Sequence, residues 1–133
     1  CMFVYGRCVY SKSTQQNCIA LSSTESELIA LSRCVRDVLW IRNLLFDFDL
    51  KVRKTIIHED NMGAIHLAKD SALSQRTKHI AIAYYFIRDH IVKNQIDIQH
   101  IDTKKNIADI FTKAMNSVQQ RIHATKLWNG LTN

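Results

Sequence analysis

The sequence predicts an α/β fold in one domain, residues 1–133, with a mixed sheet flanked by helices. Short segments rich in β-branched residues alternate along the chain with longer segments whose apolar residues recur every three or four positions. Proline is absent and glycine occurs three times in 133 residues, which indicates helix-rich structure with short turns. Hydrophobic residues make up 47% and charged residues 23%, the composition of a globular domain and not of a disordered or fibrous chain.

The chain is expected to begin with a β-hairpin. Residues 2–5 and 8–10 are rich in valine, tyrosine and phenylalanine, and Gly6-Arg7 lies between them as the turn. The following residues 11–17 are polar and predict a loop.

A long helix is predicted from the serine and threonine run at residues 22–24 to about Phe46. Two capping boxes can form at its start, one from Thr24 with Glu27 and the other from Ser22 with Glu25. One face is apolar, since leucine and valine recur at helical spacing: Leu28, Leu31, Val35, Val38 and Leu45. The length leaves room for a break near residues 37–40.

The rest of the chain is expected to alternate strands and helices. The two strands are Thr55–Glu59, which is apolar at its centre, and residues 96–99, which alternate apolar and polar side chains. The helices show apolar spacing of three or four and cover four segments: Met62–Lys69 and residues 80–91, 106–114 and 117–128. Residues 70–77 are polar and predict a turn.

Three carboxylates lie at junctions between these elements. Glu27 is in the first turn of the long helix, Asp60 follows the first predicted strand after it, and Asp109 begins a later helix. Strand ends and helix starts are where α/β folds place their chemistry, and carboxylates that converge there can hold Mg²⁺. Each also has a structural explanation, because Glu27 and Asp109 suit a helix start and Asp60 suits a turn.

Net charge, hydropathy and cysteine content indicate which partners and which compartment to expect. The net charge is +6 and the isoelectric point is near 9.3, which suits a phosphate-bearing partner. No apolar run reaches the roughly 18 residues of a membrane span, so we expect no membrane partner. The four cysteines form no close pair and no His-x-x-x-His pair occurs, which disfavours a disulfide framework or a zinc site and favours an intracellular protein.

Five stretches in collinear order resemble the ribonuclease H domain of copia-type retrotransposon Pol polyproteins. They are residues 19–31 (IALSSTESELIAL), 59–65 (EDNMGAI), 76–80 (RTKHI), 85–89 (YFIRD) and 108–113 (ADIFTK). The resemblance implies a ribonuclease H-like mixed sheet of five strands and Mg²⁺- or Mn²⁺-dependent cleavage of the RNA strand of RNA·DNA hybrids. It matches Glu27, Asp60 and Asp109 to the family's catalytic and metal-binding carboxylates. It also implies a reverse transcriptase domain upstream in a parent polyprotein, and a location in a cytoplasmic particle or the nucleus.

The chain departs from the family in one respect that bears on catalysis. The family carries a further aspartate, which bridges two metal ions, on a first strand ahead of the hairpin, and this sequence has no Asp or Glu before Glu25. We therefore expect an N-terminally shortened domain that lacks its first strand and cleaves hybrid poorly by itself. The alternative is a ribonuclease H-like module that has lost catalysis and binds nucleic acid or protein.

Basic residues near these motifs are candidates for phosphate contacts. Arg76 and Lys78 precede a predicted helix, and Lys104 and Lys105 lie shortly before Asp109. Lysine and arginine at such positions grip nucleic-acid backbones without reading sequence. They can equally be solvated surface charges.

Overall fold

The computed structural model describes residues 1–16, 20–70 and 78–131. The chain divides into two compact units, of which unit 1 comprises Cys1–Cys18 and Asp102–Asn133 and unit 2 comprises Ile19–Ile101. Each unit has a two-stranded sheet of its own. The mixed α/β class predicted from the sequence is confirmed, whereas the described strands form two separate short sheets and not one mixed sheet.

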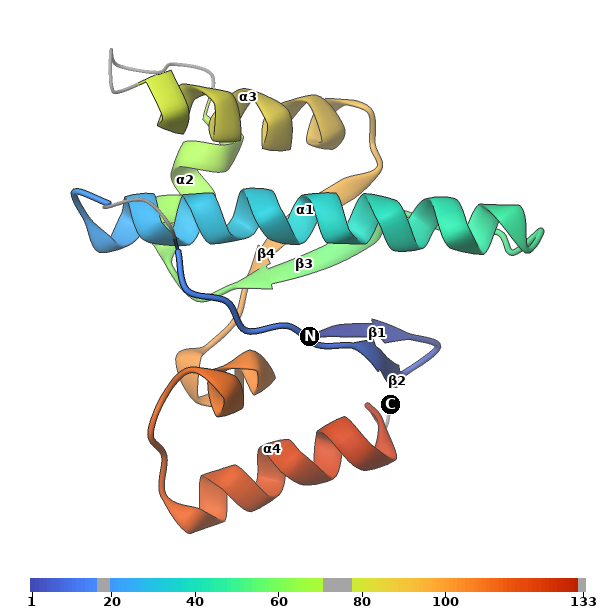
Figure 1. Ribbon diagram of the computed structural model, residues 1–133, viewed down its shortest axis with the longest axis vertical. Coiled ribbons are helices and arrows are strands. Elements are labelled where there is room, and N and C mark those ends of the chain that lie inside the picture. Colours follow the sequence, from blue (N-terminus) through green and yellow to red (C-terminus); the bar gives the residue numbers. More distant parts are fainter. Residues whose placement is uncertain (17–19, 71–77, 132–133) are drawn as a thin grey trace. The chain divides into compact units, whose positions relative to one another are not determined.

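Unit 2 is a parallel pair of strands packed with three helices (Figure 1). The strands β3 (Thr55–Glu59) and β4 (Ile96–His100) pair in register over all five residues. Helices α2 (Met62–Lys69) and α3 (Lys78–Val92) lie between them in sequence, as the crossover between parallel strands requires. The long helix α1 (Ser23–Asp47) packs against α2 and α3.

The hydrophobic core of the described residues lies in unit 2. Four of the five apolar positions predicted on α1 are buried: Leu28, Leu31, Val35 and Val38. They are joined in the core by side chains from β3, β4, α2 and α3: Ile57, Ala64, Ile65, Ala68, Ile80, Ala83, Tyr84, Ile87, Ile96 and Ile98. Tyr84 is 1% exposed, and its hydroxyl donates to the Asp70 carbonyl oxygen, so its polar end is satisfied at the end of α2.

Helix α1 is continuous, without the break that residues 37–40 allowed. Its last turn closes in a Schellman motif, in which Leu50 N–H donates to Leu45 O (3.0 Å) and Asp49 N–H donates to Phe46 O (2.9 Å). Asp49 has φ 58°, in the left-handed region that the motif demands at this position.

Unit 1 contains a hairpin and a C-terminal helix. Strands β1 (Met2–Val4) and β2 (Arg7–Tyr10) pair antiparallel. The turn falls at Tyr5-Gly6 and not at Gly6-Arg7, because both residues have positive φ (49° and 77°), as a two-residue type I′ turn needs. Helix α4 (Ser117–Asn129) confirms the last predicted helix.

The predicted helix at residues 106–114 is wrong. Two 3₁₀ helices stand there, η1 (Thr103–Lys105) and η2 (Ile107–Phe111). Asp102 and Asn106 each accept a hydrogen bond from the backbone N–H two residues on, which competes with α-helical pairing. Across the described residues, no helix is long and apolar enough to cross a membrane.

Candidate active site

The start of α1 shows which of its two glutamates supports the helix cap. Ser22 Oγ accepts from Glu25 N–H (3.2 Å), and Glu25 Oε2 accepts from Leu21 N–H (2.8 Å). The capping box is therefore built from Ser22 and Glu25, and Thr24 is not the N-cap residue. Glu25 thus belongs to the cap, and Glu27 is the second carboxylate at this end of α1.

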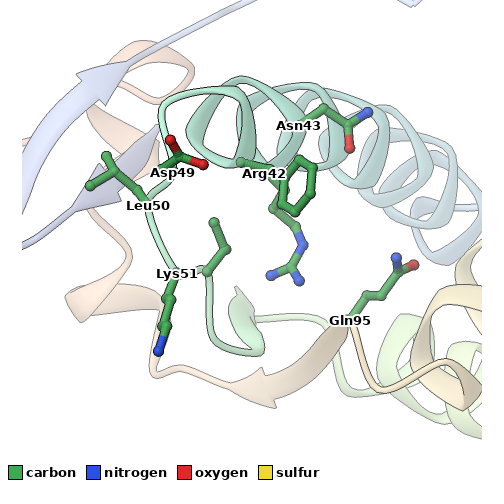
Figure 2. Close-up of a pocket in the computed structure, with 8 residues that line it drawn as sticks. Arg42, Asn43, Asp49, Leu50, Lys51 and Gln95 are labelled. Carbon is green, nitrogen blue, oxygen red and sulfur yellow. The ribbon is translucent and has the colours of Figure 1, made fainter.

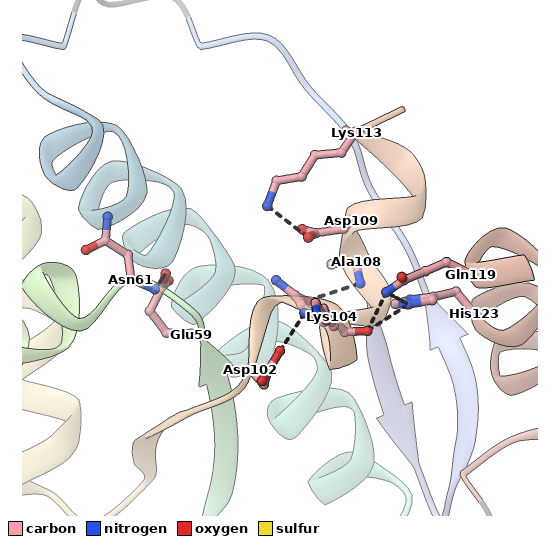
Figure 3. Close-up of polar contacts among 10 residues, drawn as sticks. Glu59, Asn61, Asp102, Lys104, Ala108, Asp109, Lys113, Gln119 and His123 are labelled. Atoms are coloured by element: carbon pink, nitrogen blue, oxygen red, sulfur yellow. Dashed lines mark hydrogen bonds and ion pairs between the residues drawn. The ribbon is translucent and has the colours of Figure 1, made fainter. Parts of the chain in front are cut away.

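The carboxyl end of β3 carries two consecutive acids. Glu59 is only 7% exposed, and its Oε1 accepts from Asn61 N–H at 3.0 Å (Figure 3). The pKa of Glu59 is raised to about 7, chiefly by burial and also by the negative charges of Glu27 and Asp60, while the Asn61 N–H opposes the rise. Glu27 from α1 and Asp60 from the strand end thus act on the same buried carboxyl group.

Glu59 is not among the residues that the sequence predicts for the site. Side chains on one face of a strand recur every second residue, so Glu59 shares the face of Ile57, and both are buried. A glutamate in register with a core isoleucine is the signal that could have revealed it.

The first turns of α1 and α2 lie close together near the carboxyl end of β3. A Cβ on Gly63, in the first turn of α2, would lie 3.0 Å from Thr24 Oγ1 and 3.1 Å from Asn61 Oδ1. Asn61 is the N-cap of α2, and its Oδ1 accepts from Ala64 N–H. The absence of a side chain at residue 63 therefore lets the first turns of α1 and α2 meet beside Glu59.

Gly63→Ala tests this contact. Alanine gains at most about 1 kcal/mol of helix propensity, but its methyl group must displace Thr24 and the Asn61 cap, so we expect a net loss of about 1 kcal/mol. Urea denaturation measures the change. In a Thr24→Ala background, where both contacting Thr24 atoms are gone, the loss should shrink; an unchanged loss would show that Thr24 is not the obstacle.

Asp109 lies in unit 1, in η2, and is 7% exposed. Its Oδ2 accepts from Lys113 Nζ at 2.8 Å, a salt bridge between a buried acid and a half-exposed lysine (Figure 3). The ammonium group compensates the buried negative charge. A metal ion at Asp109 would have to compete with Lys113.

Two side chains of α4 contact the backbone of the turn that carries the candidate phosphate-binding residues Lys104 and Lys105. Gln119 Nε2 donates to Lys104 O at 2.6 Å, and His123 Nε2 lies 3.2 Å from the same oxygen. His123 is 2% exposed, and its Nδ1 has no hydrogen-bond partner among the described residues. The side chains of Lys104 and Lys105 remain exposed while their backbone is held.

The predicted site residues are distributed over both units. Glu27 and Asp60 lie in unit 2, and Asp109, Lys104 and Lys105 lie in unit 1. Arg76 lies outside the described residues, and Lys78 is the first residue of α3. The convergence of Asp109 with Glu27 and Asp60 stays a prediction.

The donor chemistry at the β3 edge fits Mg²⁺. Glu27 and Asp60 offer the oxygen ligands that this ion takes, and a cation would relieve the negative charge that they exert on the buried Glu59. In the part of the chain that the structure describes, no three His, Cys, Asp or Glu side chains are grouped closely enough to hold a metal ion. A metal site at this edge stays a prediction.

Fold and site together define an α/β protein with acidic side chains at the carboxyl end of a parallel strand. The chain is 33% identical over 110 residues to the Retrovirus-related Pol polyprotein from transposon TNT 1-94 of Nicotiana tabacum, an alignment that covers 83% of this chain and 8% of that protein. It is 31% identical over 116 residues to the corresponding polyprotein from transposon RE1 of Arabidopsis thaliana, covering 86% and 8%. It is 26% identical over 111 residues to the Transposon Ty1-JR2 Gag-Pol polyprotein of Saccharomyces cerevisiae, covering 83% and 6%.

The homologues of this chain are therefore retrotransposon Pol polyproteins. The chain spans 6% to 8% of the length of these three relatives. No family model and no solved structure matches the chain.

Proposed function

We propose that this segment is the ribonuclease H part of a retrotransposon Pol polyprotein and hydrolyses the RNA strand of RNA·DNA hybrids. In the parent polyprotein a reverse transcriptase domain would precede it, and reverse transcription inside the cell would supply its substrate. The five collinear stretches and the Pol polyprotein relatives support the assignment. The observation that carries it is the negative charge of Glu27 and Asp60, from separate segments, acting on the buried Glu59 at the end of a parallel strand.

Glu27, Asp60 and Asp109 are the proposed ligands of Mg²⁺ or Mn²⁺. When bound, the metal ions supply activation of water and stabilisation of the leaving oxygen of a phosphodiester. The Ser22–Glu25 cap holds the turn that carries Glu27, and the Asn61 N–H orients Glu59 beside Asp60. Lys113 compensates the charge of the buried Asp109 until a cation takes its place.

A cleavage assay tests the function. The chain is incubated at high concentration with hybrid labelled on either strand, in Mg²⁺ or Mn²⁺. We expect slow cleavage of the RNA strand alone, since no Asp or Glu precedes Glu25 to supply a fourth carboxylate. A chain that neither cuts hybrid nor binds it better than duplex DNA would refute the proposal.

A second candidate function is a catalytically silent module that binds nucleic acid. The Asp109–Lys113 salt bridge favours it, because it neutralises a proposed metal ligand from within the chain. Binding of hybrid without metal-dependent cleavage would be the result expected of such a module.

Lys104 and Lys105 are expected to contribute to hybrid binding by pairing with backbone phosphates. Removing one such pairing should flatten the slope of log affinity against log salt by about 0.9 on a B-form duplex, with a similar trend on a hybrid. Replacing both lysines by alanine should therefore reduce the slope by up to about 2 and weaken all sequences alike. Fluorescence anisotropy at several salt concentrations measures it.

The matched control is the double alanine variant of Arg121 and Lys126, which removes the same charge from exposed positions of α4. If the Lys104/Lys105 variant and this control change the slope equally, the two lysines act only through net charge.

A further inference from the structure

A pocket of about 330 Å³ lies in unit 2 at the end of the sheet opposite to Glu59 (Figure 2). The lining residues come from the end of α1, the loop after it and the turn before β4: Arg42, Asn43, Phe46, Asp49, Leu50, Lys51, Val52 and Gln95. Arg42 contacts Thr55, the first residue of β3, whereas Glu59 is the last. Four strand steps of about 3.3 Å separate these two positions, so the pocket lies about 13 Å along β3 from the carboxylate edge.

Arg42 places hydrogen-bond donors in this pocket. Its Nη1 donates to Arg53 O (2.6 Å) and to Thr55 Oγ1 (2.9 Å), which fixes the guanidinium plane. In the described part of the chain, its Nε and Nη2 donate no hydrogen bond, so three N–H groups remain for a ligand. Burial lowers the pKa of the Arg42 guanidinium, because lost hydration disfavours the charge, and an acceptor on a ligand would compensate that loss.

Gln95 is also positioned in advance. Its Oε1 takes the hydrogen bond from His90 Nδ1 at 2.6 Å, and its backbone carbonyl accepts from Thr55 N–H at 3.0 Å. The side-chain NH₂ group itself makes no hydrogen bond among the described residues. Figure 2 shows Arg42 extending from α1 between Lys51 and Gln95, so donors from two elements line one space.

Asp49 adds an acceptor to the pocket lining. It occupies the left-handed position of the Schellman motif, where glycine is the usual residue and another side chain is strained. The aspartate therefore puts a carboxylate in the lining at some cost in backbone energy. A carboxylate repels phosphate, so the pocket suits a neutral group that has both donor and acceptor edges.

The surroundings of the pocket combine an aromatic ring with positive charge. Phe46 is 76% exposed although it lines the pocket, so its ring is open to stacking. Three of the four residues from 51 to 54 are basic, namely Lys51, Arg53 and Lys54, and all three are exposed. Aromatic platforms beside basic segments are how proteins hold single-stranded nucleic acid.

We propose that this pocket binds an unpaired nucleobase of single-stranded nucleic acid, with Phe46 stacking on the base and the basic loop at residues 51–54 contacting the flanking phosphates. Arg42 and Gln95 donate to the acceptors of the base, and Asp49 accepts from its N–H groups. The inference does not depend on the proposed hybrid cleavage, because it uses none of the carboxylates at the other end of β3.

The test is binding of a fluorescently labelled 12-nucleotide single strand without self-complementarity, measured by anisotropy at low salt. Phe46→Ala should weaken binding about 5- to 150-fold, the range for loss of one stacked base, and Phe46→Tyr should restore it. Phe48→Ala is the matched control, since Phe48 is 68% exposed, lies two residues away and does not line the pocket. Thermal unfolding should be unchanged in these variants because both rings are exposed.

Three further arms separate the alternatives. An abasic strand of equal length should bind much more weakly than the parent strand, and a free nucleoside monophosphate that competes fully at low concentration would identify a mononucleotide as the ligand instead. Asp60→Asn should leave this binding unchanged, which separates the pocket from the carboxylate edge. Three results would each overturn the proposal: equal losses of affinity in Phe46→Ala and Phe48→Ala, equal binding of the abasic and parent strands, or no binding of the single strand at low salt. If the single strand does not bind but a peptide does, the pocket would be reassigned to a protein partner.

Discussion

Mg²⁺ is expected to raise the melting temperature of the parent chain, and replacing Asp60 by asparagine is expected to abolish that rise. The same replacement should lower RNA cleavage at least about 100-fold, because loss of an outer partner of a metal ligand already costs about 10- to 100-fold. Asparagine keeps the shape of the side chain but removes the negative charge and one strong oxygen ligand. It also removes a negative charge that acts on Glu59, so the fold itself should not be weakened.

The control for this prediction is Asp47→Asn, the same chemical change at an exposed position at the end of α1. Thermal shift across a Mg²⁺ titration gives the first readout, and cleavage of labelled hybrid gives the second. If Asp60→Asn keeps the Mg²⁺ response of the parent chain, Asp60 is not a ligand and its position reflects turn chemistry alone.

Replacing Glu59 by glutamine is expected to stabilise the chain at neutral and alkaline pH. The pKa of Glu59 is raised from 4.5 to about 7 in the folded state, chiefly by burial, so folding favours the protonated form. The parent should therefore lose stability as pH rises from about 4.5 to about 7. Above that range the contribution of Glu59 to the free energy of unfolding no longer changes with pH. Glutamine cannot ionise and keeps an oxygen that accepts from the Asn61 N–H.

The difference in unfolding free energy between Glu59→Gln and the parent should be near zero below pH 4.5. It should grow to about 1–2 kcal/mol above pH 7, less than the full value of such a pKa change because water still screens part of the charge. Urea denaturation at pH 5 and pH 8 measures it. Asp47→Asn should follow the parent at both pH values, and a constant difference for Glu59→Gln would disprove the titration.

The helices and strands of unit 2 could be predicted because each has one strong local pattern. On α1 and α3 the apolar side chains recur at helical spacing, and on β4 they alternate, so burial follows from period alone. The choice between Ser22 and Thr24 as N-cap could not be made this way, since both offer a glutamate three residues on. The N-cap is determined by hydrogen bonds to individual backbone N–H groups, which the pattern of apolar residues does not reveal.

The features that escaped prediction depend on contacts between segments distant in sequence. Glu59 feels the negative charge of Glu27, which lies 32 positions earlier in the sequence on α1, and His123 gains its role only because α4 returns to the carbonyl of Lys104. The sequence of the segment that forms η1 and η2 predicts an α-helix because Ile107 and Ile110 have helical spacing. Instead, the side chains of Asp102 and Asn106 accept hydrogen bonds from backbone N–H groups two residues on. The position of Asp60 after a strand indicates it as a site residue, and the resemblance and a position at the start of a predicted helix indicate Asp109.

The joining of the two chain ends within unit 1 bears on the order of folding. Leu131 N–H donates to Gly6 O at 2.7 Å, and Arg7 Nη1 donates to Asn129 O across a separation of 122 residues. Closing a loop of that length in a disordered chain costs about 4 kcal/mol in its length-dependent part. If unit 2, which holds the core, collapses first, only the flanking segments outside it remain to be searched. The hairpin and α4 should then be the last parts to gain amide protection and the first to lose it, so that the two ends open as one cooperative segment while α1, α2, α3 and the parallel strands stay folded.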